Sequence, residues 1–264
     1  MAHSLSPVIF NTTFEKLSLN RTYIPFEVGR DNLKKAVDAA RALGFDGFNV
    51  TMPLKTAIID SLDRIDISAK ESGAVNTVAR TKTGLAGYNT DGEGALRALQ
   101  SYGLDLRDKR IVVLGAGGAA QALVHRFARE KNTIKILNRT PDKARRLAES
   151  TVGPAAISYG PLNKDTIVES LGQTDLLVNA TPSLTRTLLS QLNVSINLLK
   201  ETNWVFDLSY DKTSNDVLAR KGTISPLEML VQQAALSYEI WLNEQAPLSL
   251  MRSSLVDYLG KDWK

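Results

Sequence analysis

Short apolar segments alternate with longer amphipathic segments along most of this chain, which is the pattern of an α/β protein. Apolar runs predict strands at 45–50, 73–78, 111–114, 133–137, 175–179 and 204–207. Apolar residues that recur every three or four positions predict helices at 32–43, 92–102, 227–243 and 248–259. The alternation favours doubly wound, parallel sheets whose faces are covered by helices.

The most distinctive segment is a predicted buried strand, 111–114, that runs directly into a glycine turn and a helix. Gly115 permits a tight turn, and Gly117 leaves room for a phosphate beside the backbone. The small Ala120 allows the helix to pack closely on the strand. Since the first turn of such a helix offers free N–H groups to a pyrophosphate, this segment predicts a Rossmann dinucleotide-binding domain.

The residue type at the end of the next predicted strand indicates which dinucleotide binds. About twenty residues beyond the glycine turn, the apolar run 133–137 ends in Asn138-Arg139-Thr140. A Rossmann domain reads the adenosine ribose at this place, and NAD-binding proteins carry an acidic residue there. Because a guanidinium attracts a 2′-phosphate that an acid would repel, Arg139 predicts NADP.

Composition excludes several classes of protein. The chain has 264 residues, of which 43% are hydrophobic and 23% charged, enough for two ordinary globular domains. It has no cysteine for disulfides or thiolate metal sites, and its two histidines have no ligand-spaced partner, so we expect no metal and a cytoplasmic location. No apolar run predicts a membrane span. The net charge of +4 is spread among acidic residues, so we expect no nucleic-acid partner.

Polar clusters in the N-terminal part are the candidates for substrate chemistry. They are Ser4-Leu5-Ser6-Pro7, Asn49-Val50-Thr51-Met52-Pro53-Leu54-Lys55, Ala74-Val75-Asn76-Thr77 and Gly87-Tyr88-Asn89-Thr90-Asp91-Gly92. Singly, each is explained by a helix N-cap, a surface loop or turn chemistry. Together with the NADP pattern, they favour a binding site for a polyhydroxylated acid.

The glycine-turn series lies in the middle of the chain, which predicts a two-domain organisation. Residues 92–226 are expected to form the Rossmann domain, and residues 1–91 with 227–264 the substrate domain. We expect the binding site in a cleft between the two domains.

The whole set of motifs resembles the shikimate dehydrogenase (shikimate/quinate dehydrogenase) family. The motifs that occur in the family's order are S-x-S-P, N-V-T-x-P-x-K, G-A-V-N-T, G-x-N-T-D-x-x-G, G-A-G-G-A-A, N-R-T-x-x-K, V-N-A-T-P, D-x-x-Y and M-L-V-x-Q-A. The resemblance implies reduction of 3-dehydroshikimate to shikimate with NADPH, in the biosynthesis of aromatic amino acids. It also implies two α/β domains, a Rossmann NADP-binding domain and a substrate domain with a mainly parallel sheet. Many relatives are monomers or dimers, so we expect a monomer or homodimer.

The resemblance assigns roles motif by motif. Lys55 and Asp91 are the implied catalytic pair, in which the ammonium acts as general acid and the carboxylate orients it. The implied substrate-binding residues are Ser4, Ser6, Thr51, Asn76, Asn89, Tyr210 and Gln233. The implied cofactor-binding residues are Gly115, Gly117, Gly118, Ala119, Asn138, Arg139, Thr140, Lys143, Ala180, Thr181 and Met229.

The chain also departs from the family pattern. Family members carry a strand before the serine motif, usually internal to the sheet, whereas this sequence begins at Met1-Ala2-His3. The sequence is therefore truncated, or another segment or a second subunit takes the strand's place. Pro226 replaces a usual glycine, and Ser183-Leu184 replaces a usual Gly-Met, both beside the implied nicotinamide site. Two alternatives stay open: a quinate/shikimate dehydrogenase of broader specificity, and a catalytically impaired relative that only binds ligand.

Overall fold

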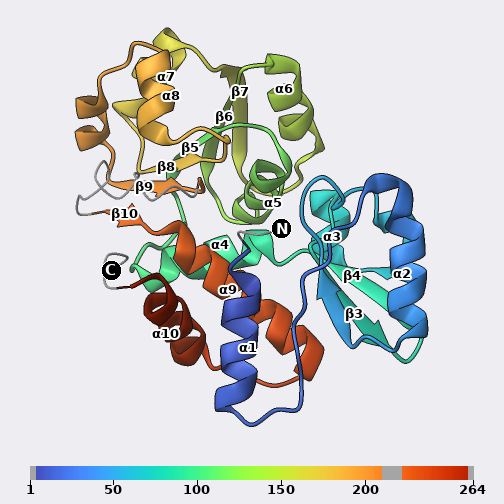
Figure 1. The fold of residues 1–264 in the computed structure, drawn as a ribbon. Coiled ribbons are helices and arrows are strands. Elements are labelled where there is room, and N and C mark those ends of the chain that lie inside the picture. The colour runs from blue at the N-terminus through green and yellow to red at the C-terminus, as the bar shows by residue number, and fades with distance from the viewer. Residues whose placement is uncertain (1–3, 210–221, 261–264) are drawn as a thin grey trace. The chain divides into compact units, whose positions relative to one another are not determined.

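The computed structural model describes residues 4–209 and 222–260 (Figure 1). The chain divides into two compact units. The two-segment unit consists of Met1–Gly94 and Leu230–Lys264, and the central unit consists of Ala95–Met229. The last two helices of the chain therefore belong largely with its N-terminal part.

Strands of the central unit form a six-stranded parallel sheet within the described residues. The order across the sheet is β7-β6-β5-β8-β9-β10, and in chain order this is the 3-2-1-4-5-6 arrangement of a Rossmann domain. Each pairing between neighbours is parallel, as predicted. The strands are β5 (Arg110–Leu114), β6 (Thr133–Asn138), β7 (Ala156–Pro161), β8 (Leu176–Asn179), β9 (Trp204–Asp207) and β10 (Thr223–Ile224).

Strand β5 contributes side chains to two apolar cores, one on each face of this sheet. Val113 packs in one core with Leu123 and Phe127. Leu114, the next residue, packs in the second core with Leu171. Because successive strand residues point to opposite faces, a continuous apolar run is the pattern that a doubly covered strand requires. The helices of this unit are α4 (Asp91–Ser101), α5 (Gly118–Phe127), α6 (Pro141–Ser150), α7 (Lys164–Leu171), α8 (Thr185–Gln191) and the 3₁₀ segment Ile196–Glu201.

The sequence pattern does not predict strand β7, because β7 lacks an apolar run. Its side chains are half-buried or exposed. Among the described strands it pairs with β6 alone, so it lies at an edge of the sheet. An edge strand buries less apolar surface than a central one, which removes the signal that marks the other strands.

The sheet of the two-segment unit corrects one prediction. Its order is β1-β3-β4-β2, and β3 pairs in antiparallel fashion with both β1 and β4, whereas β2 and β4 are parallel. The predicted mainly parallel sheet is therefore wrong for this unit. The physical reason is that only Lys82 and Thr83 connect β3 to β4, and a parallel crossover needs a dozen or more residues. The strands are β1 (Gly47–Asn49), β2 (Arg64–Ile65), β3 (Thr77–Thr81) and β4 (Gly84–Tyr88).

Strand β1 lies at an edge of this sheet. It pairs directly with β3, so no slot is open inside the sheet that the described strands form. Ser4 and Leu5 lead directly into helix α1 (Ser6–Lys16). The edges of this sheet are therefore β1 and β2.

Aromatic side chains join the first and last parts of the two-segment unit. Phe10 of α1 lies 4.7 Å from the ring of Tyr23 and 5.1 Å from that of Trp241, centroid to centroid. Helix α1 also packs against α10 (Figure 1). The helices of this unit are α1, α2 (Leu33–Ala42), α3 (Ile67–Ser72), α9 (Pro226–Leu242), α10 (Leu248–Leu259) and the 3₁₀ segments Arg30–Asn32 and Ile59–Ser61. Among the described helices, none has the length and apolar character to cross a bilayer.

Helix α3 is held at its start by Asp66, whose carboxylate accepts hydrogen bonds from the backbone N–H of Ser68 at 3.0 Å and from its hydroxyl at 2.8 Å. Burial raises the pKa of Asp66, but the hydrogen bonds from Ser68 outweigh it and leave the pKa below its usual range. The ionised carboxylate is therefore the form that stabilises this helix end.

We predict that Asp66→Ala lowers the free energy of unfolding by about 1 kcal/mol at neutral pH, because it removes this cap. The pKa of Asp66 is lower in the folded than in the unfolded chain, so its contribution is present above an unfolded pKa of about 3.9. The contribution is lost as pH falls through the lower folded value. Urea denaturation from pH 7 to pH 3 measures the difference between variant and wild type. The exposed Asp60→Ala is the control, and a difference independent of pH would contradict the capping role.

Candidate functional site

Lys55 and Asp91 form a close ion pair in the two-segment unit. The Lys55 ammonium lies 2.6 Å from an Asp91 carboxylate oxygen, and the side chains are 22% and 8% exposed. Asp91 is the first residue of α4, where the positive end of the helix dipole favours a carboxylate. The carbonyl of Lys55 accepts a hydrogen bond from the N–H of Val75, which ties the lysine's loop to the segment that leads into β3. The predicted catalytic pair is thus brought together.

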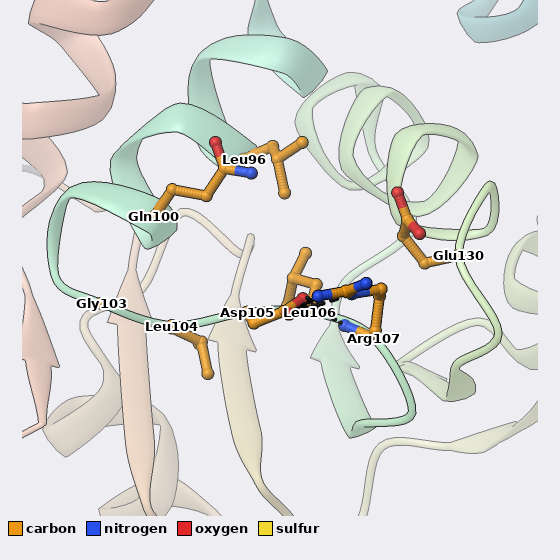
Figure 2. Close-up of a pocket in the computed structure, with 8 residues that line it drawn as sticks. All are labelled: Leu96, Gln100, Gly103, Leu104, Asp105, Leu106, Arg107 and Glu130. Carbon is orange, nitrogen blue, oxygen red and sulfur yellow. Dashed lines mark hydrogen bonds and ion pairs between the residues drawn. The ribbon is translucent and has the colours of Figure 1, made fainter.

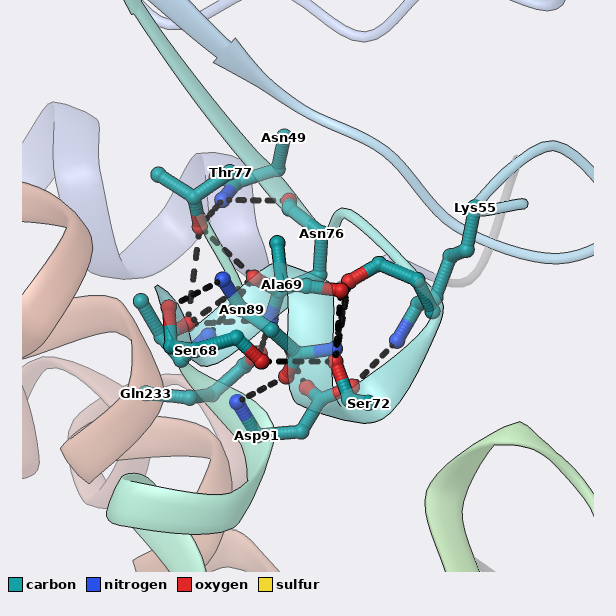
Figure 3. Close-up of polar contacts among 12 residues, drawn as sticks. Asn49, Lys55, Ser68, Ala69, Ser72, Asn76, Thr77, Asn89, Asp91 and Gln233 are labelled. Carbon is teal, nitrogen blue, oxygen red and sulfur yellow. Dashed lines mark hydrogen bonds and ion pairs between the residues drawn. The ribbon is translucent and has the colours of Figure 1, made fainter. Parts of the chain in front are cut away.

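Asn76 links this ion pair to helix α9, as Figure 3 shows. Its amide nitrogen lies 2.8 Å from the second oxygen of Asp91, 2.9 Å from the hydroxyl of Thr90 and 3.2 Å from the side-chain oxygen of Gln233. Its amide oxygen accepts a hydrogen bond from the N–H of Thr90. Asn76 is only 2% exposed, so these contacts satisfy a buried amide and fix the carboxylate of Asp91.

Asn89 fixes the backbone of Asp91. Its side-chain oxygen accepts a hydrogen bond from the N–H of Asp91, and its amide group donates to the carbonyl of Ala74. The N–H of Asn89 in turn donates to the hydroxyl of Ser68 on α3. The capped helix α3 therefore supports the loop that presents Asp91.

Gly94 is a residue whose role the sequence analysis missed, although it ends the quoted G-x-N-T-D-x-x-G motif. A Cβ atom at Gly94 would lie 2.9 Å from the backbone nitrogen of Gln233. The glycine therefore allows α4 to approach α9 closely enough for Gln233 to reach Asn76. The signal was present in the motif, but its purpose depends on a contact between distant segments.

The other predicted substrate residues take different places. Ser4 is exposed, and Ser6 is half-buried as the first residue of α1. Thr51 is exposed in the loop after β1. Among the described residues, the hydroxyls of Ser4 and Thr51 make no hydrogen bond to Asn76, Asn89, Asp91 or Gln233. Tyr210 lies outside the described residues.

The glycine turn of the central unit has the shape expected for a dinucleotide phosphate. Gly115 has φ +106°, and a Cβ there would lie 3.0 Å from the carbonyl oxygen of Ala180. At Gly117 and Gly118 an added Cβ would meet no atom within 4 Å, so the first turn of α5 faces open space. Ala119 follows in this turn, which contains no acidic residue. Free N–H groups and the helix dipole therefore fit a pyrophosphate here.

The end of β6 presents exposed cations near the start of α6. The side chain of Asn138 donates to the carbonyl of Thr140 at 2.9 Å, which shapes the turn. Arg139, Thr140 and Lys143 are exposed. Asp142, the acidic residue between the two cations, directs its carboxylate to Arg145 at 3.5 Å. Arg139 and Lys143 thus fit a phosphate group beside the turn.

A buried polar cluster fixes the loop after β8. Asn179 donates to the carboxylate of Asp207 at 3.1 Å and to the carbonyl of Ser183 at 2.8 Å. The side-chain oxygen of Asn179 accepts from the N–H and the hydroxyl of Thr181. Sequence analysis missed the contact between Asn179 and Asp207, because the two residues are 28 positions apart in the chain. The unusual Ser183-Leu184 pair is thus tied to the strand end by a backbone carbonyl.

Ala180 and Met229, two further predicted cofactor residues, are half-buried and pack against the core that contains Val113. Pro226 is the first residue of α9, where proline's fixed φ suits the first turn and its missing N–H has no helical partner to lose. The nearby N–H of Leu227 lies 3.3 Å from the hydroxyl of Ser225. Proline at this departure from the family pattern is therefore compatible with the helix start.

A separate pocket of about 420 Å³ lies in the central unit, away from the glycine turn (Figure 2). Two of its three charged residues, Asp105 and Arg107, pair with each other at 2.6 Å. Its lining comes from segments that precede β5 and β6, and ligands of open α/β sheets bind at the opposite, carboxyl ends of the strands. The residues that line it are Leu96, Gln100, Gly103, Leu104, Asp105, Leu106, Arg107 and Glu130. The pocket is therefore distinct from the predicted cofactor site.

Comparison with known proteins covers nearly the whole chain. Residues 1–78 match the family model of the shikimate dehydrogenase substrate binding domain. Residues 96–214 match the model of shikimate / quinate 5-dehydrogenase, and residues 227–256 match that of the shikimate 5′-dehydrogenase C-terminal domain.

Individual relatives agree with these family models. Shikimate dehydrogenase (NADP⁺) of Methanopyrus kandleri is 41% identical over 97% of this chain and 92% of its own length. The crystal structure of shikimate 5-dehydrogenase from Listeria monocytogenes, with shikimate and NAD, has a TM-score of 0.86 at 31% identity, over 97% of this chain and 93% of that one. The Thermus thermophilus enzyme with NADP(H) and shikimate has a TM-score of 0.81 at 31% identity, over 96% and 94%. On the motifs, the two units and these similarities, the chain belongs to the shikimate dehydrogenase family.

Proposed function

We propose that this protein is an NADP-dependent oxidoreductase that interconverts 3-dehydroshikimate and shikimate. The observation that carries the proposal is the Lys55–Asp91 contact, held by the buried amide of Asn76. The names of the relatives and the ligands of the solved structures support the same substrate and cofactor. We assign residues 1–91 with 227–264 to substrate binding and residues 92–226 to cofactor binding.

Lys55 is the proposed acid in the reduction. NADPH supplies a hydride to the ring ketone when it is bound. The Lys55 ammonium donates a proton to the oxygen that becomes the alkoxide, which completes the alcohol. In the oxidation direction the neutral amine accepts the hydroxyl proton.

Asp91 is proposed to orient Lys55. One of its oxygens contacts the ammonium and the other contacts Asn76, so the carboxylate cannot rotate without losing a buried contact. A fixed carboxylate holds the ammonium in one direction, which lowers the entropic cost of bringing acid and substrate together. Asp91 also keeps a positive charge stable in a largely buried place.

The substrate is a ring that carries several hydroxyls and a carboxylate, and the two-segment unit offers groups for each. Gln233 accepts from Asn76 through its side-chain oxygen, so its amide nitrogen remains a donor for a ring hydroxyl. Asn89 keeps one amide hydrogen beyond its bond to Ala74. The proposed substrate residues are Ser4, Ser6, Thr51, Asn76, Asn89, Tyr210 and Gln233, with the serines and Tyr210 at the carboxylate.

The central unit is proposed to hold NADP. Gly115, Gly117, Gly118 and Ala119 form the turn that fits the pyrophosphate. The residues proposed around the 2′-phosphate are Asn138, Arg139, Thr140 and Lys143. Those proposed near the nicotinamide are Ala180, Thr181 and Met229.

The experiment that tests this function is reduction of NADP⁺ by the purified chain, followed at 340 nm with shikimate as the alcohol. Parallel reactions use quinate in place of shikimate and NAD⁺ in place of NADP⁺. We expect turnover with shikimate and NADP⁺ and much slower turnover in the other combinations. Comparable rates with quinate would favour the broader quinate/shikimate activity, which the family model of residues 96–214 also covers. Shikimate binding without any turnover would favour the impaired, ligand-binding relative.

We predict that Arg139→Ala raises the KM for NADP⁺ about 10- to 100-fold, because one charged hydrogen bond of about 1.5–3 kcal/mol is lost. The KM for NAD⁺ should stay within about twofold, since NAD⁺ has no 2′-phosphate for the guanidinium to contact. Initial-rate kinetics with both cofactors make the measurement. Arg146→Ala, at an exposed arginine of helix α6 that follows Arg139 in the chain, is the matched control. An unchanged preference for NADP⁺ in Arg139→Ala would remove Arg139 from the assignment.

A further inference from the structure

Tyr23 lies between the first serine-bearing helix and the polar cluster around Asn76. Its ring stacks on Phe10 with an interplanar angle of 13°. Its backbone N–H donates to the side-chain oxygen of Asn11 at 2.7 Å, and its carbonyl accepts from the same amide at 3.0 Å. Ring and backbone are therefore both fixed, so the position of the hydroxyl is determined by the fold.

The hydroxyl of Tyr23 is buried and hydrogen-bonded to Asn49. It donates to the side-chain oxygen of Asn49 at 3.0 Å. Burial raises the pKa of Tyr23 to about 12, and a side-chain hydrogen bond with Ser6 acts in the opposite direction. At neutral pH the hydroxyl is thus protonated and is the donor to Asn49.

Asn49 connects Tyr23 to Asn76, Thr77 and Ser237. Its amide nitrogen lies 3.2 Å from the carbonyl oxygen of Asn76, 3.0 Å from the hydroxyl of Thr77 and 3.1 Å from the hydroxyl of Ser237. A backbone carbonyl can only accept, so the nitrogen of Asn49 must face Asn76 and its oxygen must face Tyr23. The orientation of the amide therefore follows from its partners.

The two hydroxyls beyond Asn49 reach the residues that contact Asp91. Thr77 donates to the side-chain oxygen of Asn76 at 3.0 Å. Ser237 donates to the carbonyl of Gln233 at 3.1 Å, one helical turn before it on α9. A continuous series of hydrogen bonds thus runs from Tyr23 through Asn49, Thr77 and Asn76 to Asp91 and Lys55. Phe10 and Asn11 fix the start of this series to helix α1, the helix that begins with Ser6.

We propose that Tyr23 and Asn49 are positioning residues that couple the serine end of the substrate site to the Lys55–Asp91 pair. They make no contact with the reacting atoms in this account and act through helix α1, which begins with Ser6, and through Asn76. The inference rests on the proposed function, because it takes Ser6 as a contact of the substrate carboxylate. Its consequence is that correct seating of the carboxylate and correct orientation of the acid depend on the same buried hydroxyl.

The first test is Tyr23→Phe, which keeps the ring on Phe10 and removes only the hydroxyl. We expect the KM for shikimate to rise about tenfold and the KM for NADP⁺ to stay unchanged, because the hydrogen bond that holds Asn49 between helix α1 and Asn76 is lost. Tyr238→Phe is the matched control, since Tyr238 is a buried tyrosine of the same unit whose ring lies near Phe14. A purely structural role would lower the melting temperature of both variants alike and leave both KM values for shikimate unchanged, which would overturn the proposal.

A double-mutant cycle tests whether Tyr23 acts through Ser6. The set is Ser6→Ala, Tyr23→Phe and the double variant, compared by KM for shikimate and by the dissociation constant from calorimetry. If the residues act as one unit, the double variant should be no more than about twofold worse than Ser6→Ala alone. Fold-changes that multiply would show independent action and contradict the coupling.

The controls separate this inference from the proposed function. A wild-type chain that oxidises shikimate while Tyr23→Phe behaves like wild type overturns the inference alone. If the wild-type chain binds shikimate without turnover, the cycle is decided on dissociation constants. A wild-type chain that neither binds nor oxidises shikimate overturns both.

Discussion

The buried carboxylate of Asp91 is the constraint on which the substrate side of this protein depends. A carboxylate that is 8% exposed must be paired and hydrogen-bonded, because an unpaired buried charge costs several kcal/mol. Lys55 supplies the opposite charge, and Asn76 and Asn89 supply amide contacts to the side chain and backbone. These partners come from separate segments of residues 55–91, so the charge is satisfied only when these segments are folded together. The requirement of stability and the requirement of chemistry are therefore met by the same contacts.

Much of the central unit could be predicted because each of its signals is local. A fully apolar run marks β5, and the glycine turn follows it within a few residues, so strand, turn and helix appear together in the sequence. Edge strand β7 lacks such a run and was not predicted. In the two-segment unit, the predicted mainly parallel sheet is wrong because β3 and β4 form a hairpin, and only Lys82 and Thr83 lie between the two strands.

The polar site of the two-segment unit could be predicted only as a set of residue types. The motifs indicated Lys55, Asp91 and Asn76, but their arrangement depends on contacts between residues far apart in the chain. Asn49 and Ser237, for example, are 188 positions apart, yet the amide nitrogen of Asn49 lies 3.1 Å from the hydroxyl oxygen of Ser237. Gly94 shows the same limit, because its purpose is visible only where α4 approaches α9. The local motifs therefore indicate which residue types take part in the site, and the packing of distant segments determines which of these side chains contact one another.

The most direct test of the central claim is the turnover number of Lys55→Met for NADP⁺ reduction with shikimate, beside the exposed Lys70→Met as control. The account predicts that Lys55→Met lowers kcat by about 100-fold or more, because the general acid is lost while the aliphatic stem remains. Lys70→Met should keep the wild-type kcat, and both variants should bind NADP⁺ as wild type does. A kcat within a few-fold of wild type in Lys55→Met would contradict the role given to the Lys55–Asp91 pair.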